Sequence, residues 1–338
     1  MKRLLILKGY LLTICFYPLF ASYAQDTQTD FNADGVSEFG QVVIQNDKSL
    51  AWRSVSPDGN SETALGTLGV SGNHLIPARW KVSDKPQIGV VSLNDAGRNI
   101  IWKIMNDNST TEERQFGARN NTIISGADFN GSGVADAAHA KLNKKTIIWN
   151  IAYDIFFHPA GQAGTRTIRF GRPGDRIFYA SPDGISDWIG VIGLTPNKRR
   201  TLVRLRSLLS NTVVKSNRFP ASLSRNTRPR PFPIKQADGT DILGFAIQRR
   251  NDTRMLFRTM NGAVVSNTIF PGKGDIVVGN FISGPAEQVA IKTNSGYTVF
   301  DPFTQNTTEV QTVSGIAFDH ININTLQAPK NSNPGGGG

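Results

Sequence analysis

A repeat of about fifty residues runs through most of this 338-residue chain and limits the folds available to it. Each copy opens with a polar residue and a short run of small and β-branched residues. The openings begin at Glu38, Gln87, Asp136, Asp187, Asp241 and Glu287, which are 49, 49, 51, 54 and 46 residues apart. A second apolar run, such as Asn99-Ile-Ile-Trp102, follows in each copy after turn residues. Each repeat therefore predicts a β-hairpin.

Six such hairpins separated by extended polar stretches favour an all-β fold, and we predict a single β-propeller over residues 25–328. Six blades of four short strands fit the spacing best, and seven blades are the alternative. A parallel β-helix usually has a shorter repeat, and tandem sandwich domains need a longer one. The segment Thr312–Asp319 is similar to Thr122–Asp128, so we expect the N- and C-terminal strands to pair and close the ring.

The two ends of the chain have compositions of their own. Residues 1–24 combine a basic head, an apolar run and small residues up to Ala24, which predicts a secretory signal peptide. A membrane anchor is the alternative, but the apolar run is short for a span. The single cysteine, Cys15, lies in this segment, so the mature chain has no disulfide and must rely on core burial, ring closure or metal. Residues 329–338 end in four glycines and predict a disordered tail. We expect a secreted, extracellular or periplasmic monomer with no transmembrane segment in the mature chain.

Two acidic stretches have the spacing of a cation-binding loop. They are Asp30-Phe-Asn-Ala-Asp-Gly-Val-Ser-Glu38 and Asp128-Phe-Asn-Gly-Ser-Gly-Val-Ala-Asp136. Calcium takes six to eight oxygen ligands in flexible geometry, and side chains at every second position let one loop supply several of them. Glycine at the sixth position permits the backbone angle that such a loop requires. A metal-free turn held by its own side chains is the alternative.

These stretches resemble the metal loop of FG-GAP/VCBS repeats, which build integrin-like β-propellers. Phe116-Gly117 and Phe170-Gly171 stand where that family often has a Phe-Gly pair. The resemblance extends over most of residues 30–322 and is strongest in the first and third repeats; the fourth keeps a fragment that includes Asp183 and Asp187. It implies structural calcium at one or two sites. The implied ligands are Asp30, Asn32, Asp34, the Val36 carbonyl and Glu38 in the first loop, and Asp128, Asn130, Ser132, the Val134 carbonyl and Asp136 in the third.

Positive charge is concentrated in one part of the sequence. The formal net charge is +11, and between Asn197 and Arg258 there are 15 basic residues and only three acidic ones. Arginine makes bidentate contacts with carboxylate, sulfate and phosphate groups. We therefore regard this sector as a candidate polyanion site, with a merely solvated basic face as the alternative. Its candidate residues are Arg199, Arg200, Arg204, Arg228, Arg230, Arg249, Arg250 and Arg254.

We predict no catalytic residues, because no known catalytic motif is present and the four histidines lack metal-ligand spacing. The expected function is a calcium-stabilised, non-enzymatic binding or adhesion module. Its expected partner is an acidic polysaccharide, another polyanion or a cell-surface protein; specific nucleic-acid binding is not expected, since no aromatic residues alternate with the arginines. A polysaccharide lyase or hydrolase on a propeller scaffold and a protein-binding scaffold of the cell envelope are the alternatives. Trp52, Trp102 and Trp149 are expected between blades, whereas Trp80 and Trp188 are better candidates for exposed contacts.

Overall fold

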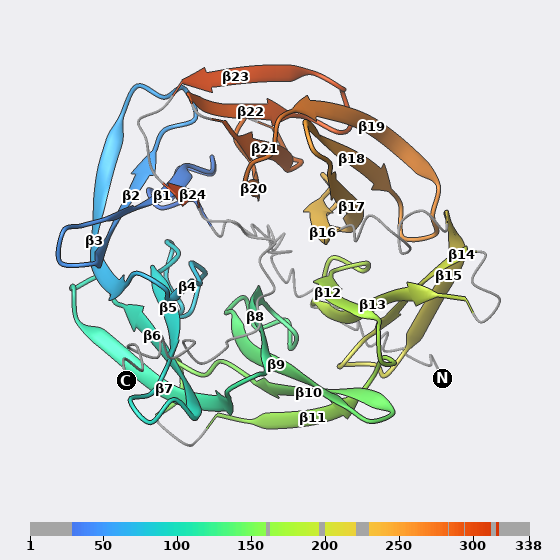
Figure 1. The fold of residues 1–338 in the computed structure, drawn as a ribbon, viewed down its shortest axis with the longest axis horizontal. Helices are drawn as coiled ribbons and strands as arrows, with labels where there is room; N and C mark the ends of the chain where they lie inside the picture. The colour runs from blue at the N-terminus through green and yellow to red at the C-terminus, as the bar shows by residue number, and fades with distance from the viewer. Residues whose placement is uncertain are drawn as a thin grey trace, which may run out of the picture.

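Six four-stranded antiparallel sheets stand in a ring around one axis (Figure 1). This computed structural model describes residues 29–159, 163–195, 200–220, 230–282, 284–293, 295–311 and 316–317. Every regular element within these ranges is a strand, so the described part has no helix long and apolar enough to cross a membrane. The predicted signal peptide, residues 1–24, and the predicted tail, residues 329–338, lie outside the described residues. The predicted six-bladed propeller is confirmed.

Each blade is an up-and-down meander whose strands we call A to D from the axis outward (Figure 1). Blade one contains β24 (Ile316–Ala317), β1 (Phe39–Ile44), β2 (Ser49–Val55) and β3 (Glu62–Val70). Blade two contains β4 (His74–Leu75), β5 (Gly89–Leu93), β6 (Asn99–Met105) and β7 (Thr111–Ala118). Blade three contains β8 (Thr122–Ala127), β9 (Asp136–Asn143), β10 (Thr146–Ala152) and β11 (Thr165–Arg169).

The other three blades follow the same order. Blade four contains β12 (Arg176–Ala180), β13 (Trp188–Leu194), β14 (Arg200–Arg206) and β15 (Val213–Pro220). Blade five contains β16 (Arg230–Lys235), β17 (Asp241–Gln248), β18 (Asp252–Arg258) and β19 (Val264–Pro271). Blade six contains β20 (Ile276–Gly279), β21 (Gln288–Lys292), β22 (Gly296–Phe300) and β23 (Thr307–Gln311).

The ring closes by pairing of strands from opposite ends of the chain. β24 lies antiparallel to β1, with Ala317 opposite Gln41 and Ile316 opposite Val42. The first blade thus takes its innermost strand from the C-terminal region, as the sequence predicted, and β1 is left without an open edge toward the axis.

The core lies between neighbouring blades, and three tryptophans at equivalent C-strand positions anchor it. Each is at most 1% exposed, and its indole N–H donates to a carbonyl in strand D or directly after it, 2.8 Å away: Trp52 to Leu68, Trp102 to Phe116 and Trp149 to Phe170. The residue after each acceptor is a glycine with φ of 84°, 105° and 115° respectively. A Phe-Gly pair in blades two and three, and Leu68-Gly69 in blade one, therefore serves as the acceptor for a buried indole, and glycine supplies the backbone conformation that this requires.

The prediction of exposed contacts for the other two tryptophans is wrong. Trp80 is fully buried and packs edge-on against Trp102 and Phe156, with ring centroids 5.8 and 5.6 Å away. Trp188 is 7% exposed and donates its indole N–H to Asp183 at 3.0 Å. Both tryptophans lie next to polar loops in the sequence. These loops fold back over the two large side chains, so that their apolar area is buried.

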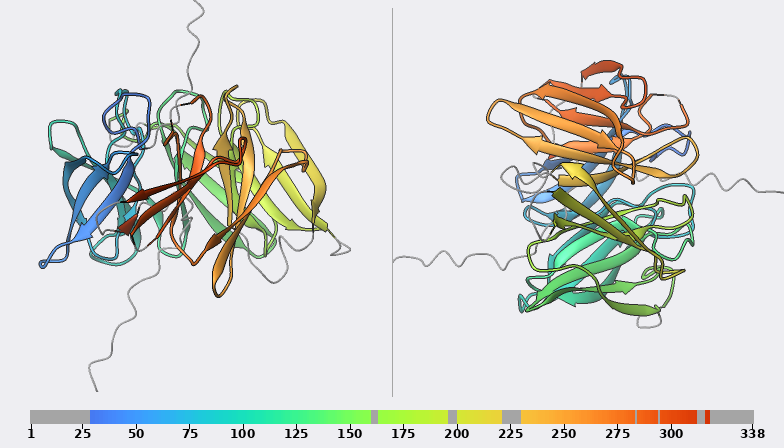
Figure 2. Two further views of the ribbon diagram at one scale, coloured as in Figure 1. Left: turned by 90° about the horizontal axis from the view of Figure 1, so that it is seen from above. Right: turned by 90° about the vertical axis from the view of Figure 1, so that its right-hand side faces the viewer.

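The meander sends its connections alternately to the two ends of each blade (Figure 2). A–B and C–D connections lie on one face of the ring, here called the AB face. B–C and D–A connections lie on the other, here called the BC face. Contacts between neighbouring A–B loops confirm that these loops share a face: the amide of Ala135 in blade three donates to the carbonyl of Arg79 in blade two at 2.7 Å.

Candidate functional site

The first acidic loop brings three carboxylates to one point on the AB face. One oxygen each from Asp30, Asp34 and Glu38 lies within 4.8 Å of the others. Calcium binds oxygen at about 2.3–2.6 Å, so one ion can contact oxygens up to about 5 Å apart. The donor set therefore fits a hard cation. Asn32 and Val36 lie in the same loop. The side-chain oxygen of Asn32 accepts a hydrogen bond from the backbone amide of Asp34 at 2.9 Å.

The loop's own backbone holds these carboxylates in place. The carboxylate of Asp30 accepts the amides of Asp34 and Gly35 at 3.1 and 2.9 Å, and Gly35 has φ of 88°. Glu38 accepts the amide of Phe31 at 2.6 Å, while the Phe31 ring is buried between blades one and two. The loop is therefore ordered at both ends by the core beneath it.

Burial makes the negative charge of this loop unfavourable without a cation. The pKa of Glu38 is raised to about 7, first by burial and then by the charges of Asp30 and Asp34. The pKa of Asp30 is also raised by burial, against the lowering effect of the Gly35 and Asp34 amides. A bound cation would favour the ionised form of both groups.

The loop of blade three gathers a carboxylate that lies outside its own sequence. Asp154, in the C–D connection after β10, accepts the Ser132 hydroxyl at 2.6 Å and the Asn130 side-chain amide at 2.8 Å. Its amide donates to Asp136 at 2.8 Å. Ser132 occupies the position in this loop that Asp34 occupies in the first loop. Asp154 supplies a carboxylate beside it. Sequence reasoning missed Asp154 because nothing near it in the chain marks it as part of this loop.

The remaining donors of this loop are arranged as in blade one. Asp128 accepts the amides of Ser132 and Gly133 at 3.0 and 2.7 Å, and Asp136 accepts the amide of Phe129 at 2.7 Å. Burial raises the pKa of Asp136 to about 8 and raises that of Asp128, with further contributions from the charge of Asp154. The Val134 carbonyl oxygen lies 3.5 Å from the Ser132 hydroxyl oxygen, whose hydrogen is donated to Asp154. These residues and Asp154 thus form one hydrogen-bond network, but among the described residues only Asp30, Asp34 and Glu38 of the first loop bring three carboxylate oxygens within 4.8 Å of one another.

In blade four the expected counterpart of Asp136 is one residue off. Asp136 pairs with Ala127 at the end of strand A, and the residue that pairs with the corresponding Ala180 is Trp188, not Asp187. A shift of one residue turns a strand side chain to the opposite side. The carboxylate of Asp187 accepts the amide of Asp128 in the neighbouring blade at 2.7 Å.

The candidate arginines that the structure describes fall into an exposed group and a partly buried group. Arg249 and Arg250 are exposed at a B–C turn, and Arg200 is exposed at the start of β14, next to another. The Nε atom of Arg249 lies 3.9 Å from a carboxylate oxygen of Asp252. Arg204 pairs with Asp175, and its side chain is only 15% exposed, with the guanidinium 5.6 Å from the centre of the Phe170 ring. Arg204 therefore belongs to the packing between blades three and four, and Arg254 is half-buried beside Arg258. Arg199, Arg228 and the side chain of Arg230 lie outside the described part.

Charge in the described connections is sorted between the two faces. Basic residues predominate in the B–C and D–A connections, which contain Lys48, Arg98, Arg119, Lys144, Lys145, Arg172, Arg249, Arg250 and Lys273 against Asp47, Asp95, Asp175 and Asp275. The A–B and C–D connections contain Asp30, Asp34, Glu38, Asp58, Asp84, Asp107, Asp128, Asp154, Asp183, Asp187, Asp238, Glu287 and Asp301 against Arg79, Lys81 and Lys85. The basic residues of the BC face come from several blades and not from the 197–258 sector alone.

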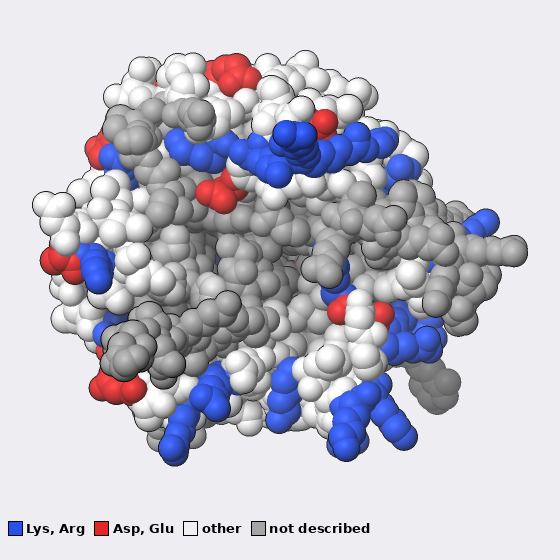
Figure 3. Space-filling view, viewed as in Figure 1, with Lys and Arg blue, Asp and Glu red and all other residues white. Residues whose placement is uncertain are grey.

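The surface view shows how widely the basic side chains are distributed. On the face turned to the viewer in Figure 1, Lys and Arg side chains surround much of the ring and form a row across the upper blades, with few acidic side chains between them (Figure 3). Such a distribution gives a positive potential over an extended area.

Comparison with known proteins provides no family for this chain. No family model matches the sequence, and no curated protein matches it. Among solved structures, prolyl oligopeptidase B from Galerina marginata is similar with a TM-score of 0.45 and 14% identity, covering 84% of this chain and 43% of that one. The AfRom2 CNH domain gives a TM-score of 0.37 at 9% identity, covering 82% and 85%. A mutant apocarotenoid oxygenase from Synechocystis gives 0.38 at 9% identity, covering 84% and 69%. The chain spans less than half the length of the peptidase.

Proposed function

We propose that this chain is a secreted, calcium-stabilised β-propeller that binds acidic glycans or other polyanions without catalysing a reaction. The observation that carries this proposal is the sorting of charge between faces. Several carboxylates of the AB face are buried, including Asp30, Glu38, Asp136 and Asp187. Because most of the acidic residues of the described connections lie on the opposite face, they compensate the exposed cations of the BC face only weakly.

The BC face suits an extended polymer better than a compact anion. Its exposed basic side chains stand on turns of several blades, for example Arg98 in blade two, Lys144 in blade three and Arg250 in blade five. A chain with repeated negative charges can contact several of these turns at once, and the weak contacts add. Polymer binding through such contacts depends strongly on salt, because counterions are released.

Calcium enters the proposal as a stabiliser of the opposite face. Asp30, Asp34 and Glu38, whose carboxylate oxygens converge within 4.8 Å, would hold one ion. A second ion at the third loop would require Asp128, Asp136 and Asp154 to move closer together. The likeness of both loops to FG-GAP/VCBS repeats agrees with this role, and so does the chemistry of the donor sets. An ion at these loops would supply positive charge where burial opposes ionised carboxylates.

Retention on immobilised heparin and on immobilised polygalacturonate tests the proposal. The double variant Arg249→Gln/Arg250→Gln should elute at a lower salt concentration than the native chain. A matched variant, Lys81→Gln/Lys85→Gln, removes two positive charges from the AB face and should elute with the native chain. Equal elution of all three proteins, or no retention of the native chain at low salt, would contradict the proposal.

A further inference from the structure

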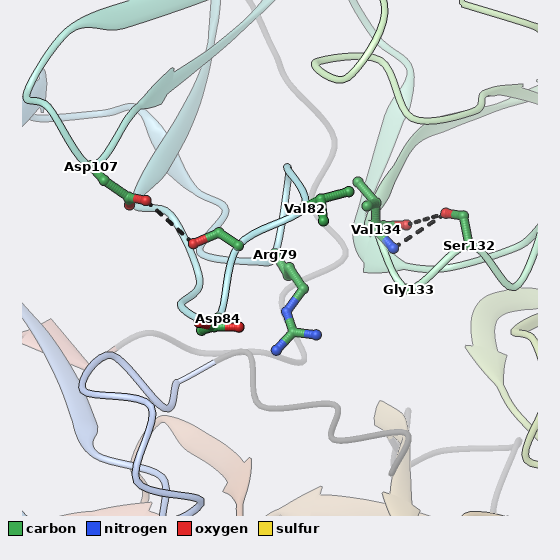
Figure 4. A pocket seen from close by; sticks show the side chains of 8 residues that line it. Arg79, Val82, Asp84, Asp107, Ser132, Gly133 and Val134 are labelled. Atoms are coloured by element: carbon green, nitrogen blue, oxygen red, sulfur yellow. Dashed lines mark hydrogen bonds between the residues drawn. The ribbon is translucent and has the colours of Figure 1, made fainter. Parts of the chain in front are cut away.

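An open cavity of about 480 Å³ lies on the AB face between blades two and three (Figure 4). The A–B loop of blade two forms one side with Arg79 and Asp84, and the C–D turn of the same blade adds Asp107. The A–B loop of blade three forms the other wall with residues 132–134. The cavity is therefore lined by charged side chains on one side and by a tightly turned loop on the other.

Arg79 places a positive charge at the wall of this cavity. Its guanidinium makes no hydrogen bond or ion pair with any residue in the described ranges. Its backbone is fixed, because its carbonyl accepts the amide of Ala135 and the next residue, Trp80, is fully buried against Trp102. Figure 4 shows the Arg79 side chain extending between Asp84 and the loop of blade three. An anionic ligand group would meet a guanidinium on a well-ordered backbone.

Two carboxylates, those of Asp84 and Asp107, line the same cavity and can accept hydrogen bonds. Asp84 is exposed and forms no bond to another described residue, and Asp107 accepts the Ser83 hydroxyl at 3.3 Å. A ligand that fills the cavity must therefore bring one acidic group for Arg79 and hydrogen-bond donors for Asp84 and Asp107. A second negative charge on the ligand would be repelled by these two carboxylates.

We infer that this cavity binds a single uronic acid unit of a glycan. The sugar carboxylate would accept a bidentate pair of hydrogen bonds from Arg79, and its hydroxyl groups would donate to Asp84 and Asp107. The cavity volume lies within the range of small-molecule sites. The ligand class of this site rests on the proposed function. The cavity lies on the AB face, opposite to the basic turns. It would bind one sugar unit, whereas the BC face would bind a polymer through its total charge.

The same chemistry distinguishes the sugar acid from its nearest relatives. Glucose keeps the hydroxyl groups but lacks the carboxylate, so it cannot pair with Arg79. Glucose 6-phosphate carries more negative charge close to Asp84 and Asp107, and it should bind more weakly than glucuronate. Acetate keeps the carboxylate but has no hydroxyl groups for the two aspartates.

Isothermal titration of the full chain in calcium with glucuronate, glucose, glucose 6-phosphate and acetate tests the inference. Glucuronate should bind most tightly, and Arg79→Gln should weaken it by about tenfold or more. The control Arg98→Gln removes an exposed arginine from the B–C turn of the same blade and should leave the affinity unchanged. Asp84→Asn/Asp107→Asn provides a second, independent variant and should lower the preference for glucuronate over acetate.

The outcomes separate this site from the basic face. Glucuronate binding that is absent, unchanged in Arg79→Gln, or no tighter than binding of glucose 6-phosphate would overturn the cavity assignment while heparin retention stands. Conversely, loss of heparin retention in Arg249→Gln/Arg250→Gln with unchanged glucuronate affinity would support two separate sites. A native chain that binds glucuronate but not heparin would overturn the role of the basic face alone.

Discussion

Asp128 and Asp187 exchange two hydrogen bonds across the boundary between blades three and four. The amide of Asp187 donates to the carbonyl of Asp128 at 2.7 Å, and the amide of Asp128 donates to the carboxylate of Asp187 at 2.7 Å. The pair Ser181 and Asp241 repeats this exchange between blades four and five, and Lys235 and Glu287 repeat it between blades five and six. An acidic side chain at the start of strand B therefore joins neighbouring blades in this half of the ring.

Removing one of these carboxylates should weaken the ring at a defined boundary. Asp187→Ala leaves the Asp128 amide without its acceptor, and we expect a loss of about 1–3 kcal/mol in the free energy of unfolding. Denaturant unfolding followed by tryptophan fluorescence would measure this loss. Asp95→Ala, at an exposed turn, is the control and should leave stability unchanged; equal effects of both substitutions would contradict the role of Asp187.

Chelation should destabilise the chain if the acidic loops hold calcium. We expect EDTA to lower the melting temperature, and Asp34→Ala to remove most of that sensitivity, because Asp34 supplies an exposed carboxylate to the first loop. Asp154→Ala should reduce the remaining sensitivity to EDTA, because Asp154 adds a carboxylate to the third loop. Differential scanning calorimetry in EDTA and in calcium checks both. A melting curve that EDTA leaves unchanged would mean that neither loop needs a cation.

The pH dependence of stability should differ with and without calcium. Burial raises the pKa of Glu38 to about 7 and that of Asp136 to about 8, whereas unfolded carboxyl groups titrate near pH 4. Between those values the folded chain holds protons that the unfolded chain has lost, so stability is greatest at low pH within this window and falls as pH rises through about 8. In EDTA the melting temperature should therefore fall from pH 5 to pH 8, and calcium should flatten the slope. A rise over this range in EDTA would contradict the assignment.

The contribution of the Trp149 indole hydrogen bond to stability should be measurable separately from the packing of the Trp149 side chain. Trp149→Phe keeps a large aromatic side chain but leaves the Phe170 carbonyl without its 2.8 Å donor. We expect a cost of about 1–3 kcal/mol for the buried unpaired carbonyl. Trp149→Ala should cost more, because it also removes buried apolar area. Urea unfolding of the two variants gives the comparison, and a neutral Trp149→Phe would show that the hydrogen bond contributes little.

The sequence was sufficient for the blade count and for ring closure because both depend on features that repeat. The apolar runs recur at a nearly constant interval, and the segment that contains Ile316 and Ala317 is similar to an inner strand. The alternating positions in the first acidic loop also correctly placed Asp30, Asp34 and Glu38 together.

Other features depend on contacts between distant segments, which the repeat does not reveal. The one-residue offset at Asp187 follows from the pairing of Trp188 with Ala180, and the position of Asp154 follows from the folding of a C–D connection over the loop of blade three. The burial of Trp80 depends on Phe156 in the next blade. The sorting of charge between faces could be recognised only after every turn had been assigned to an end of its blade.

The affinity for an acidic polysaccharide as a function of salt tests the central claim most directly. Titration of the calcium-loaded chain with polygalacturonate or heparin over a range of sodium chloride concentrations gives log Kd against log salt. The account predicts measurable binding at low salt and a linear weakening as salt rises, with a smaller slope for Arg249→Gln/Arg250→Gln. Absence of binding at low salt, or an affinity that does not change with salt, would contradict it.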